Sequence, residues 1–163
     1  MHNSTETERL FLDTITTRDY EFVISLVNSK GWLQFIGERN VHSQAEAVAY
    51  IGKILDSQNF YYWVVRIKEG SIPVGIISFI KQEYLNHFDI VFAFLPQYQG
   101  NGYAYEATKE ILRVVHAAKK YDPVLATTIP GNVNSVKLLI KLGFHFEKEF
   151  EVSEQLLHLY SNA

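Results

Sequence analysis

Two glycines stand close together where an apolar segment gives way to a helical pattern. They lie in segment 99–104 (QGNGYA), directly after the aromatic and β-branched run 88–95. Because glycine has no Cβ, such a loop lets several backbone N–H groups converge on an anion at the positive end of a helix. A phosphate or pyrophosphate group is the natural ligand, although an ordinary strand-to-helix turn has the same pattern.

Two familiar phosphate motifs do not fit this loop. A P-loop requires Lys and then Ser or Thr after its last glycine, whereas Tyr103 and Ala104 follow Gly102. A dinucleotide fingerprint requires a third glycine where Tyr105 stands and an acid at the end of the next strand, but Asp122 precedes that strand. Both motifs are therefore excluded.

The lack of cysteine and the spacing of the histidines exclude further classes of site. The chain has no cysteine, which removes thiol nucleophiles, iron–sulfur clusters and cysteine-ligated zinc. The histidines have no metal-ligand spacing, so we predict no metal site. They are His2, His42, His87, His116, His145 and His158.

The composition of the chain limits the kinds of protein that it can be. With 163 residues, 47% of them hydrophobic, the chain can bury a core without a metal or disulfide, and we expect a single domain over 1–163. A net charge of −3 lacks the basic excess of a nucleic-acid-binding protein. The polar opening is unlike a signal peptide, and no apolar stretch is long enough to span a bilayer. We therefore expect a soluble, cytoplasmic protein without nucleic-acid or membrane partners.

Two helices are predicted in the first third of the chain. Thr16 and Asp19 resemble a capping pair ahead of apolar residues at helical spacing, and that helix ends near 28–31. Ser43 opens a capping box before a second helix, which stops near 56–59.

The rest of the chain alternates between strand and helix patterns. Short connections favour antiparallel pairing of the first three strands, and Asn132 or Asn134 caps a helix that Gly143 closes. The predicted elements are strands at 61–67, 74–80 and 88–95, a helix at 103–118, a strand at 122–129, a helix up to 142, and strands at 146–152 and 156–160. This order predicts an α/β fold with a mixed, mostly antiparallel central sheet of about six or seven strands flanked by about four helices.

The glycine loop resembles that of one enzyme family. Gln99-x-x-Gly102-x-Ala104 is similar to the acyl-CoA loop of the GCN5-related N-acetyltransferase (GNAT) family. Gln97-x-x-Gly100-x-Gly102 fits the same pattern in a shifted register. We prefer the first register because it places the small Ala104 in the first turn of the helix.

A second element makes the resemblance more specific. Segment 132–144 (NVNSVKLLIKLGF) resembles the Asn-x-x-Ser, Leu-Leu, Lys-Leu-Gly-Phe segment of the GNAT branch that acetylates the N-termini of ribosomal proteins (RimJ/RimL-like). The opening 7–12 (TERLFL) is similar to that branch as well. Together these elements cover nearly the whole chain in the family's order.

The resemblance implies where acetyl-CoA, the co-substrate, would bind. In the family, the strand before the loop separates from its neighbour and pairs its backbone with the pantetheine amides. Asn132 and Ser135 lie where relatives contact the pantetheine arm and the thioester end, although Asn132 is also a plain N-cap. The implied cofactor-binding residues are Ala93, Phe94, Leu95, Gln99, Gly100, Asn101, Gly102, Tyr103, Ala104, Asn132 and Ser135.

The implied catalytic residues are Ser135 and Asp89. Many relatives use a tyrosine to protonate the leaving thiolate, but Leu139 stands there, and Ser135 is the substitute that the resembling branch implies. The alternative for Ser135 is a hydrogen bond to nearby backbone. Asp89 stands where another branch places its general base, with a solvated strand-end carboxylate as the alternative. Glu83 and Glu147 are weaker candidates for the base.

The implied reaction transfers an acetyl group directly from acetyl-CoA to a primary amine. A peptide α-amine is the expected acceptor, because its pKa of about 7.7 to 8.0 makes it easier to deprotonate at pH 7 than a lysine of about 10.4. On the same reasoning, Asp89→Asn is expected to harm the reaction most at low pH. Two alternatives stay open. One is a small amine (polyamine, amino sugar or antibiotic), indicated by an enclosed acidic pocket, and the other is a non-catalytic acyl-CoA-binding sensor.

In this family, recognition of the acceptor lies in the variable early segment, here 31–42, and in the last hairpin. A group of five aromatic residues is a candidate lining for either an enclosed pocket or an open groove, although strand alternation makes about half of 61–63 core. The group comprises Trp32, Phe35, Tyr61, Tyr62 and Trp63.

Overall fold

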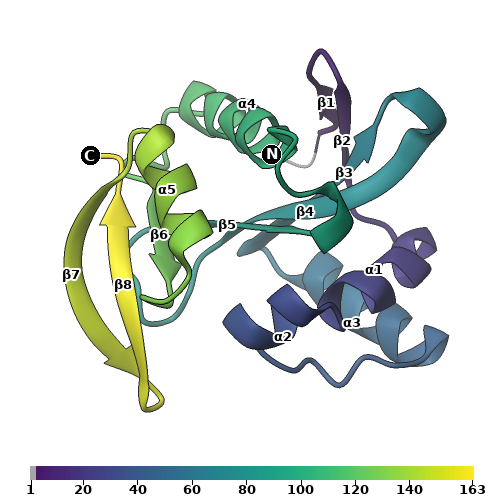
Figure 1. Ribbon diagram of the computed structural model, residues 1–163, viewed down its shortest axis with the longest axis horizontal. Coiled ribbons are helices and arrows are strands. Elements are labelled where there is room, and N and C mark those ends of the chain that lie inside the picture. The colour runs from purple at the N-terminus through teal and green to yellow at the C-terminus, as the bar shows by residue number, and fades with distance from the viewer. Residues whose placement is uncertain (1–2) are drawn as a thin grey trace.

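A computed structural model describes residues 3–163, which form one eight-stranded sheet with five α-helices (Figure 1). The strand order is β1-β2-β3-β4-β5-β6-β8-β7, and neighbours are antiparallel except β5 and β6, which are parallel. The strands are β1 (Thr5–Glu6), β2 (Leu10–Thr14), β3 (Phe60–Ile67), β4 (Ile72–Ile80), β5 (Asp89–Phe94), β6 (Leu125–Thr128), β7 (His145–Val152) and β8 (Gln155–Ser161). The predicted mixed, mostly antiparallel α/β fold is confirmed, with slightly more strands and helices than expected.

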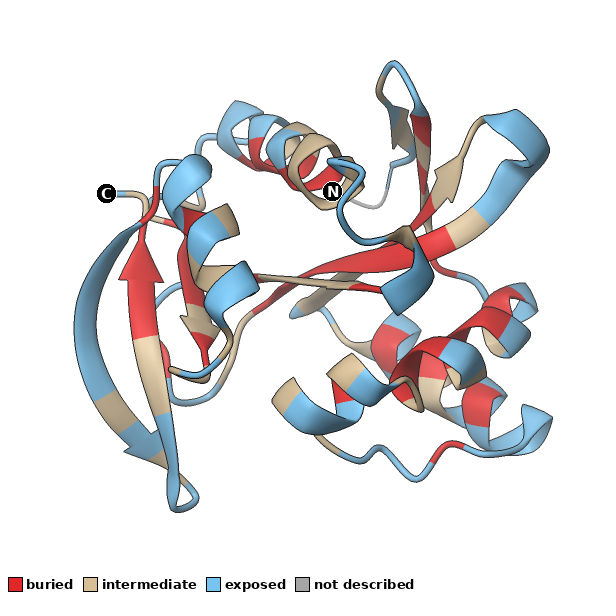
Figure 2. Ribbon diagram, viewed as in Figure 1, coloured by how far each residue is buried: buried red, intermediate tan, exposed pale blue. Residues whose placement is uncertain are grey.

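The helices divide between the two faces of the sheet. Strand alternation makes this possible: Trp63 and Val65 pack toward α4 and α5, whereas Val64 packs toward the other three helices. Figure 2 shows buried residues along the central strands and on the inner sides of the helices, while β7 is mostly exposed. The α-helices are α1 (Tyr20–Val27), α2 (Lys30–Phe35), α3 (Gln44–Asp56), α4 (Tyr103–Ala117) and α5 (Val133–Lys141); short 3₁₀-helices lie at Thr17–Asp19, Glu69–Ser71 and Pro96–Tyr98.

Local capping signals set most helix ends where the sequence predicts them. Thr16 and Asp19 form a complete capping box, and the Ser43 hydroxyl accepts from the Glu46 N–H at 3.2 Å. Asn132, rather than Asn134, caps α5, and Gly143 follows that helix with a φ of 92°, in the left-handed region that glycine allows.

Helix α2 is the α-helix that the sequence did not reveal. The first helix ends at Val27, one residue before the predicted range of 28–31, but the chain then forms six further helical residues. Ser29 precedes α2 without making a side-chain cap hydrogen bond, and so short a helix shows little periodicity. Among residues 3–163, no helix is long and apolar enough to cross a membrane.

Candidate active site

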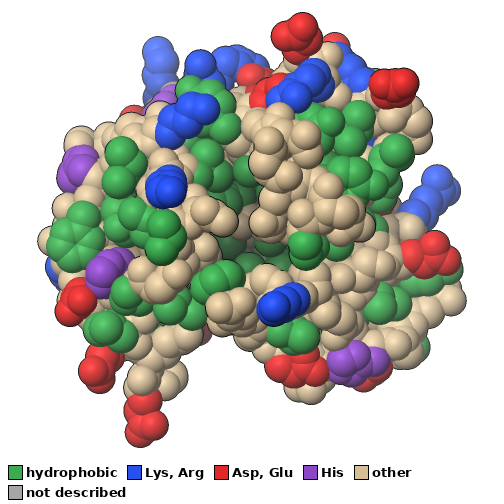
Figure 3. Space-filling model, viewed as in Figure 1, with side chains coloured by type: hydrophobic (Ala, Val, Ile, Leu, Met, Phe, Trp, Pro, Cys, Tyr) green, Lys and Arg blue, Asp and Glu red, His purple; other side chains and the backbone are tan. Residues whose placement is uncertain are grey.

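A cleft of about 630 Å³ opens where β5 and β6 part. The two strands pair at Asp89 and Leu125; beyond that point, the paired residues of β5 in the described chain have their partners on β4. The cleft runs between these strands and is bounded by the glycine loop, the first turn of α4, α5 and α2. Figure 3 shows the molecule hollowed here, with hydrophobic side chains around the hollow and acidic ones toward the periphery.

The glycine loop has the backbone conformation that an anion-binding loop needs. Gly100 and Gly102 have φ of 82° and 78°, in the left-handed region, and Gly102 is the N-cap of α4. The first turn of a helix leaves its N–H groups without partners inside the helix. Because Tyr103, Ala104 and Tyr105 line the cleft, that turn brings the positive end of α4 to it.

Strand β5 ends at this loop in a close contact with β4. The register pairs Gly75 with Phe94, and a Cβ at Gly75 would lie 2.5 Å from the Phe94 ring. Glycine is therefore required there for the ring to lie across β4. The Gln99 amide donates to the Phe94 carbonyl at 3.3 Å, so the first residue of the motif fastens the loop to the end of β5.

The start of α5 brings two predicted residues to the opposite wall. The Asn132 side-chain oxygen accepts from the Ser135 N–H at 3.3 Å, so Asn132 is an N-cap and also lines the cleft. Ser135 lines the cleft half-buried, and within residues 3–163 its hydroxyl has no hydrogen-bond partner. Leu139, at the usual tyrosine position, is 1% exposed and packs in the core.

Asp89 lies at the point where β5 and β6 begin to part. It is 0% exposed, so the alternative of a solvated strand-end carboxylate is wrong. Its Oδ2 accepts from the Thr127 hydroxyl at 3.4 Å, and its Oδ1 has no partner in the described chain. Burial raises the pKa of Asp89 to about 7, against the opposing effects of Thr127 and Lys81.

The connection from Asp89 to the cleft is indirect. Asp89 itself is not among the lining residues, whereas Thr127 is. Thr127 is therefore the residue that connects the carboxylate of Asp89 to the lining of the cleft. The weaker candidates, Glu83 and Glu147, are exposed and do not line it.

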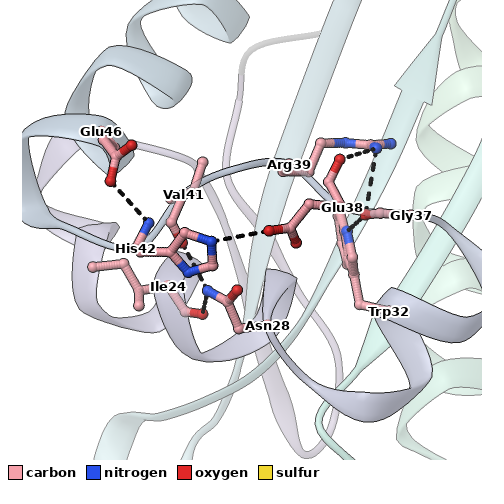
Figure 4. A network of polar contacts seen from close by, with 9 residues as sticks. All are labelled: Ile24, Asn28, Trp32, Gly37, Glu38, Arg39, Val41, His42 and Glu46. Atoms are coloured by element: carbon pink, nitrogen blue, oxygen red, sulfur yellow. Dashed lines mark hydrogen bonds and ion pairs between the residues drawn. The ribbon is translucent and has the colours of Figure 1, made fainter.

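Helix α2 forms the remaining wall, with Ser29 before it and Ile36 after it. Trp32 and Phe35 line the cleft, as the aromatic pattern suggested, whereas Tyr61, Tyr62 and Trp63 do not. Side-chain hydrogen bonds fix the following loop, as Figure 4 shows. The Asn28 amide donates to the carbonyls of Ile24 and Val41 at 2.8 and 2.7 Å, and the Trp32 indole donates to the Gly37 carbonyl at 3.0 Å.

The charged residues that line the cleft are both basic. They are Lys30 on α2 and Lys141 on α5, and the lining in the described chain includes no aspartate or glutamate. Lys141 lies over the Tyr105 ring, 4.1 Å from its centroid. Within residues 3–163, the lining of this cleft therefore does not form the acidic pocket that would indicate a small-amine acceptor.

The structure brings most of the predicted cofactor-binding residues to the cleft, with two exceptions. Leu95 donates its N–H to the Val74 carbonyl at 2.9 Å, and Asn101 lies behind the loop with its carbonyl bonded to Arg9. Those that line the cleft are Ala93, Phe94, Gln99, Gly100, Gly102, Tyr103, Ala104, Asn132 and Ser135.

Sequence reasoning missed several lining residues. Thr127 and Thr128 line the cleft because β6 separates from β5. Lys30, Gln34 and Ile36 line it because α2 packs beside it. No spacing marks these positions, because their role depends on elements that meet only in the fold. Among the described residues, no three His, Asp or Glu side chains form a group that could hold a metal; His2 lies outside those residues.

Comparison with known proteins identifies a family that has this architecture. Residues 9–145 match the family model described as an acetyltransferase (GNAT) domain. An uncharacterized N-acetyltransferase of Bacillus subtilis, YnaD, is 26% identical over 89% of this chain and 84% of its own.

Two solved structures share the fold at low sequence identity. RimL, a ribosomal L7/L12 α-N-protein acetyltransferase in complex with coenzyme A, has a TM-score of 0.84 at 15% identity, covering 98% of this chain and 97% of its own. Spermidine N-acetyltransferase from Vibrio cholerae, in complex with CoA and spermine, has a TM-score of 0.80 at 18% identity, covering 95% of each chain.

Proposed function

The chain belongs to the GNAT acetyltransferase family, and we propose that this N-acetyltransferase transfers the acetyl group of acetyl-CoA to the α-amine of a peptide or protein N-terminus. The observation that carries the choice of acceptor is the charge of the cleft. A polyamine brings several positive charges, which need carboxylates around them, whereas the charged lining residues are Lys30 and Lys141. A peptide N-terminus brings one cationic amine followed by a neutral backbone.

The glycine loop is the proposed site for the pyrophosphate of acetyl-CoA. Its support is the pair of left-handed glycines at the N-terminus of α4, where N–H groups and the helix dipole favour an anion. The proposed partner of the pantetheine arm is the edge of β5 that faces away from β4, where β6 has separated. Asn132 and Ser135 bound the same cleft from α5.

Direct attack of the amine on the thioester is the proposed chemistry, since the chain has no cysteine for a covalent intermediate. The amine nitrogen bonds to the carbonyl carbon, the carbon–sulfur bond breaks, and the Ser135 hydroxyl donates a hydrogen bond to the departing thiolate. The proton lost by the amine passes through the Thr127 hydroxyl to Asp89. Holding the two substrates in attack geometry contributes the largest part of the lowering of the activation barrier, roughly 7 to 11 kcal/mol.

The pKa of Asp89 supports an α-amine as the acceptor. A carboxylate with a pKa of about 7 lies within about one unit of a peptide α-amine at ~7.7 to 8.0, so moving the proton costs about 1 kcal/mol. The same transfer from a lysine amine at ~10.4 costs about 4 to 5 kcal/mol. Asp89 is therefore better matched to an N-terminal amine.

The test compares kcat/KM for matched acceptors between pH 6 and 9. One peptide has a free N-terminus and no lysine. The second has an acetylated N-terminus and the same sequence with one internal residue replaced by lysine, and spermidine and glucosamine represent small amines. We expect the free N-terminus to be the fastest acceptor across this range. Faster transfer to the lysine peptide, or to spermidine, would contradict the proposal, and binding of acetyl-CoA without transfer to any acceptor would favour the sensor.

A further inference from the structure

The N-terminal strand is fastened to α4 through a row of side-chain contacts. The Thr5 hydroxyl donates to Glu110 Oε1 at 2.6 Å, and the Thr7 hydroxyl donates to Glu106 Oε2. Two residues of extended chain span about 6.6 Å, close to the ~6 Å between helix positions four residues apart. The row therefore runs along α4 toward its N-terminus, and it ends at Arg9.

Arg9 reaches the glycine loop from the side opposite the cleft. Its Nε donates to Glu106 Oε1 at 2.8 Å, and its Nη1 donates to the Asn101 carbonyl at 3.0 Å. A Cβ at Gly102 would lie 3.4 Å from its Nη2, and the guanidinium carbon lies 4.6 Å from the centroid of the Tyr103 ring. Arg9 does not line the cleft, so it contacts the loop from behind.

Glu106 places a negative charge at the N-terminus of α4, where the phosphates would bind. It lies in the first turn of α4, beside the N–H groups of 103–105. Burial alone would raise its pKa, but hydrogen bonds from Thr7 and Arg9 hold the pKa below its ordinary value. The carboxylate is therefore ionised at neutral pH, and left unpaired it would repel a phosphate at the same helix end.

We propose that Arg9 is a positioning residue for the phosphate loop, which fixes the Asn101 carbonyl and neutralises Glu106 so that the N-terminus of α4 accepts the phosphates of acetyl-CoA. The inference rests on the proposed binding of acetyl-CoA at this loop. It assigns to the opening segment a role in cofactor affinity, without contact between Arg9 and the cofactor. It also predicts that the loss caused by removing Arg9 depends on the charge of Glu106.

The test is a double-mutant cycle with CoA as the calorimetric probe. Arg9→Gln should weaken CoA binding roughly tenfold, the size of one helix-end charge interaction in a favourable site. Glu106→Gln should bind CoA at least as well as the wild type. The double variant should return to within about threefold of the wild type, because the unpaired carboxylate has gone.

A second readout separates charge from fold. S-Acetylpantetheine lacks the phosphates, so its KM should be unchanged in Arg9→Gln. Arg113→Gln is the matched control: it breaks the pair with Glu110, whose side-chain atoms are 2.8 and 2.9 Å apart, farther along the same helix. That variant should bind CoA like the wild type. Arg9→Lys, which keeps the charge, should lose less affinity than Arg9→Gln.

Three results would overturn the inference. Undiminished CoA binding by folded Arg9→Gln, or by the uncharged Arg9→Met if Arg9→Gln does not fold, would remove the role of Arg9. A double variant as weak as Arg9→Gln would show that Glu106 does not oppose the phosphates. A wild-type protein that binds no CoA would overturn the proposed function and this inference with it.

Discussion

The two sides of the cleft are built from different parts of the chain. On the loop side, residues 99–105 offer left-handed glycines and the first turn of α4, so the main chain forms the wall. On the α2 side, residues 29–36 form the wall with side chains, including Lys30, Trp32 and Phe35. A wall formed by left-handed main chain requires glycine at particular positions, whereas a wall formed by side chains can be built from many different residue types. The loop side therefore carries a signature that can be read from the sequence, whereas the α2 side does not.

The largest effect is expected on the loop side, from Gly102→Val. A branched residue at a φ of 78° is strained by about 1 to 2 kcal/mol or more. Its Cβ would also lie 3.4 Å from Arg9 Nη2, so we expect the loop to leave the conformation that directs its N–H groups toward the anion. We expect CoA affinity to fall at least ~100-fold by calorimetry, with circular dichroism of the folded protein preserved. Gly52→Val, in α3, is the control, because no atom lies near a Cβ built there. Undiminished affinity in folded Gly102→Val would rule out the loop as the site.

The next effect concerns Asp89, which is buried where β5 and β6 begin to part. If Asp89 accepts the proton, Asp89→Asn should lower kcat/KM roughly 100-fold at pH 8. At pH 6 the loss should be smaller, because a carboxyl with a pKa of about 7 is then mostly protonated in the wild type as well. This reverses the pH dependence expected for an ordinary carboxylate. Glu83→Gln, at an exposed carboxylate, should leave both values unchanged.

The same substitution should change stability in the opposite direction. The pKa of Asp89 is about 7 when folded and ~3.9 when unfolded, so the folded protein binds the extra proton between about pH 4 and 7. Stability conferred by that proton is lost as the pH rises through this window. Asp89→Asn should therefore be more stable than the wild type at pH 8, by up to roughly 4 kcal/mol, but not at pH 4. Denaturant unfolding at both pH values measures this, and equal stability at pH 8 would contradict the raised pKa.

A smaller effect is expected from Ser135→Ala, on the α5 wall. Its hydroxyl has no partner in the described chain, so its removal should leave the fold and the KM for acetyl-CoA nearly unchanged. We expect kcat to fall about tenfold, because the interaction with the thiolate matters mainly in the transition state. Ser135→Thr keeps a hydroxyl and should retain more activity. An unchanged kcat, with chemistry rate-limiting, would reject the role of Ser135.

The smallest effect is expected on the α2 side, from Asn28→Ala. Removing its amide frees the carbonyls of Ile24 and Val41 and loosens the loop beside α2. We expect the KM for the acceptor to rise about threefold while the KM for acetyl-CoA stays constant. Glu38→Gln, which weakens an exposed pair with His42, should change neither constant. A shift in the KM for acetyl-CoA would show that the two sides are not independent.

The predictability of the fold follows the length and repetition of each pattern. Helix α4 and strands β3 to β5 repeat their periods over several turns or residues, and caps such as Ser43 mark helix ends, so their positions were predicted within a few residues. Helix α2 has six residues and no side-chain cap, and β1 has two residues, so neither leaves a periodic signal.

The predictability of the site follows the kind of atom that forms it. Gly100 and Gly102 reveal a main-chain loop because only glycine readily adopts their φ. The burial of Asp89, which fixes its pKa, depends on β4 and β6 closing around it and cannot be seen in one segment. The pairing of Arg9 with Glu106 joins residues far apart in sequence, and neither has a neighbour that marks the contact.

The parting of β5 and β6 also divides the sheet mechanically. Strands β1 to β5 form one continuous ladder and β6 to β8 another, and the two meet at the pairing of Asp89 with Leu125. A molecule bound along the free edge of β5 would supply the backbone hydrogen bonds that β5 and β6 do not make with each other there. Backbone amides of Phe92 and Phe94, which face away from β4, should then exchange hydrogen slowly in the complex and faster without it. Ligand at 100 times its Kd would add about 2.7 kcal/mol to the stability of the whole chain, so the co-substrate would also act as a structural strand.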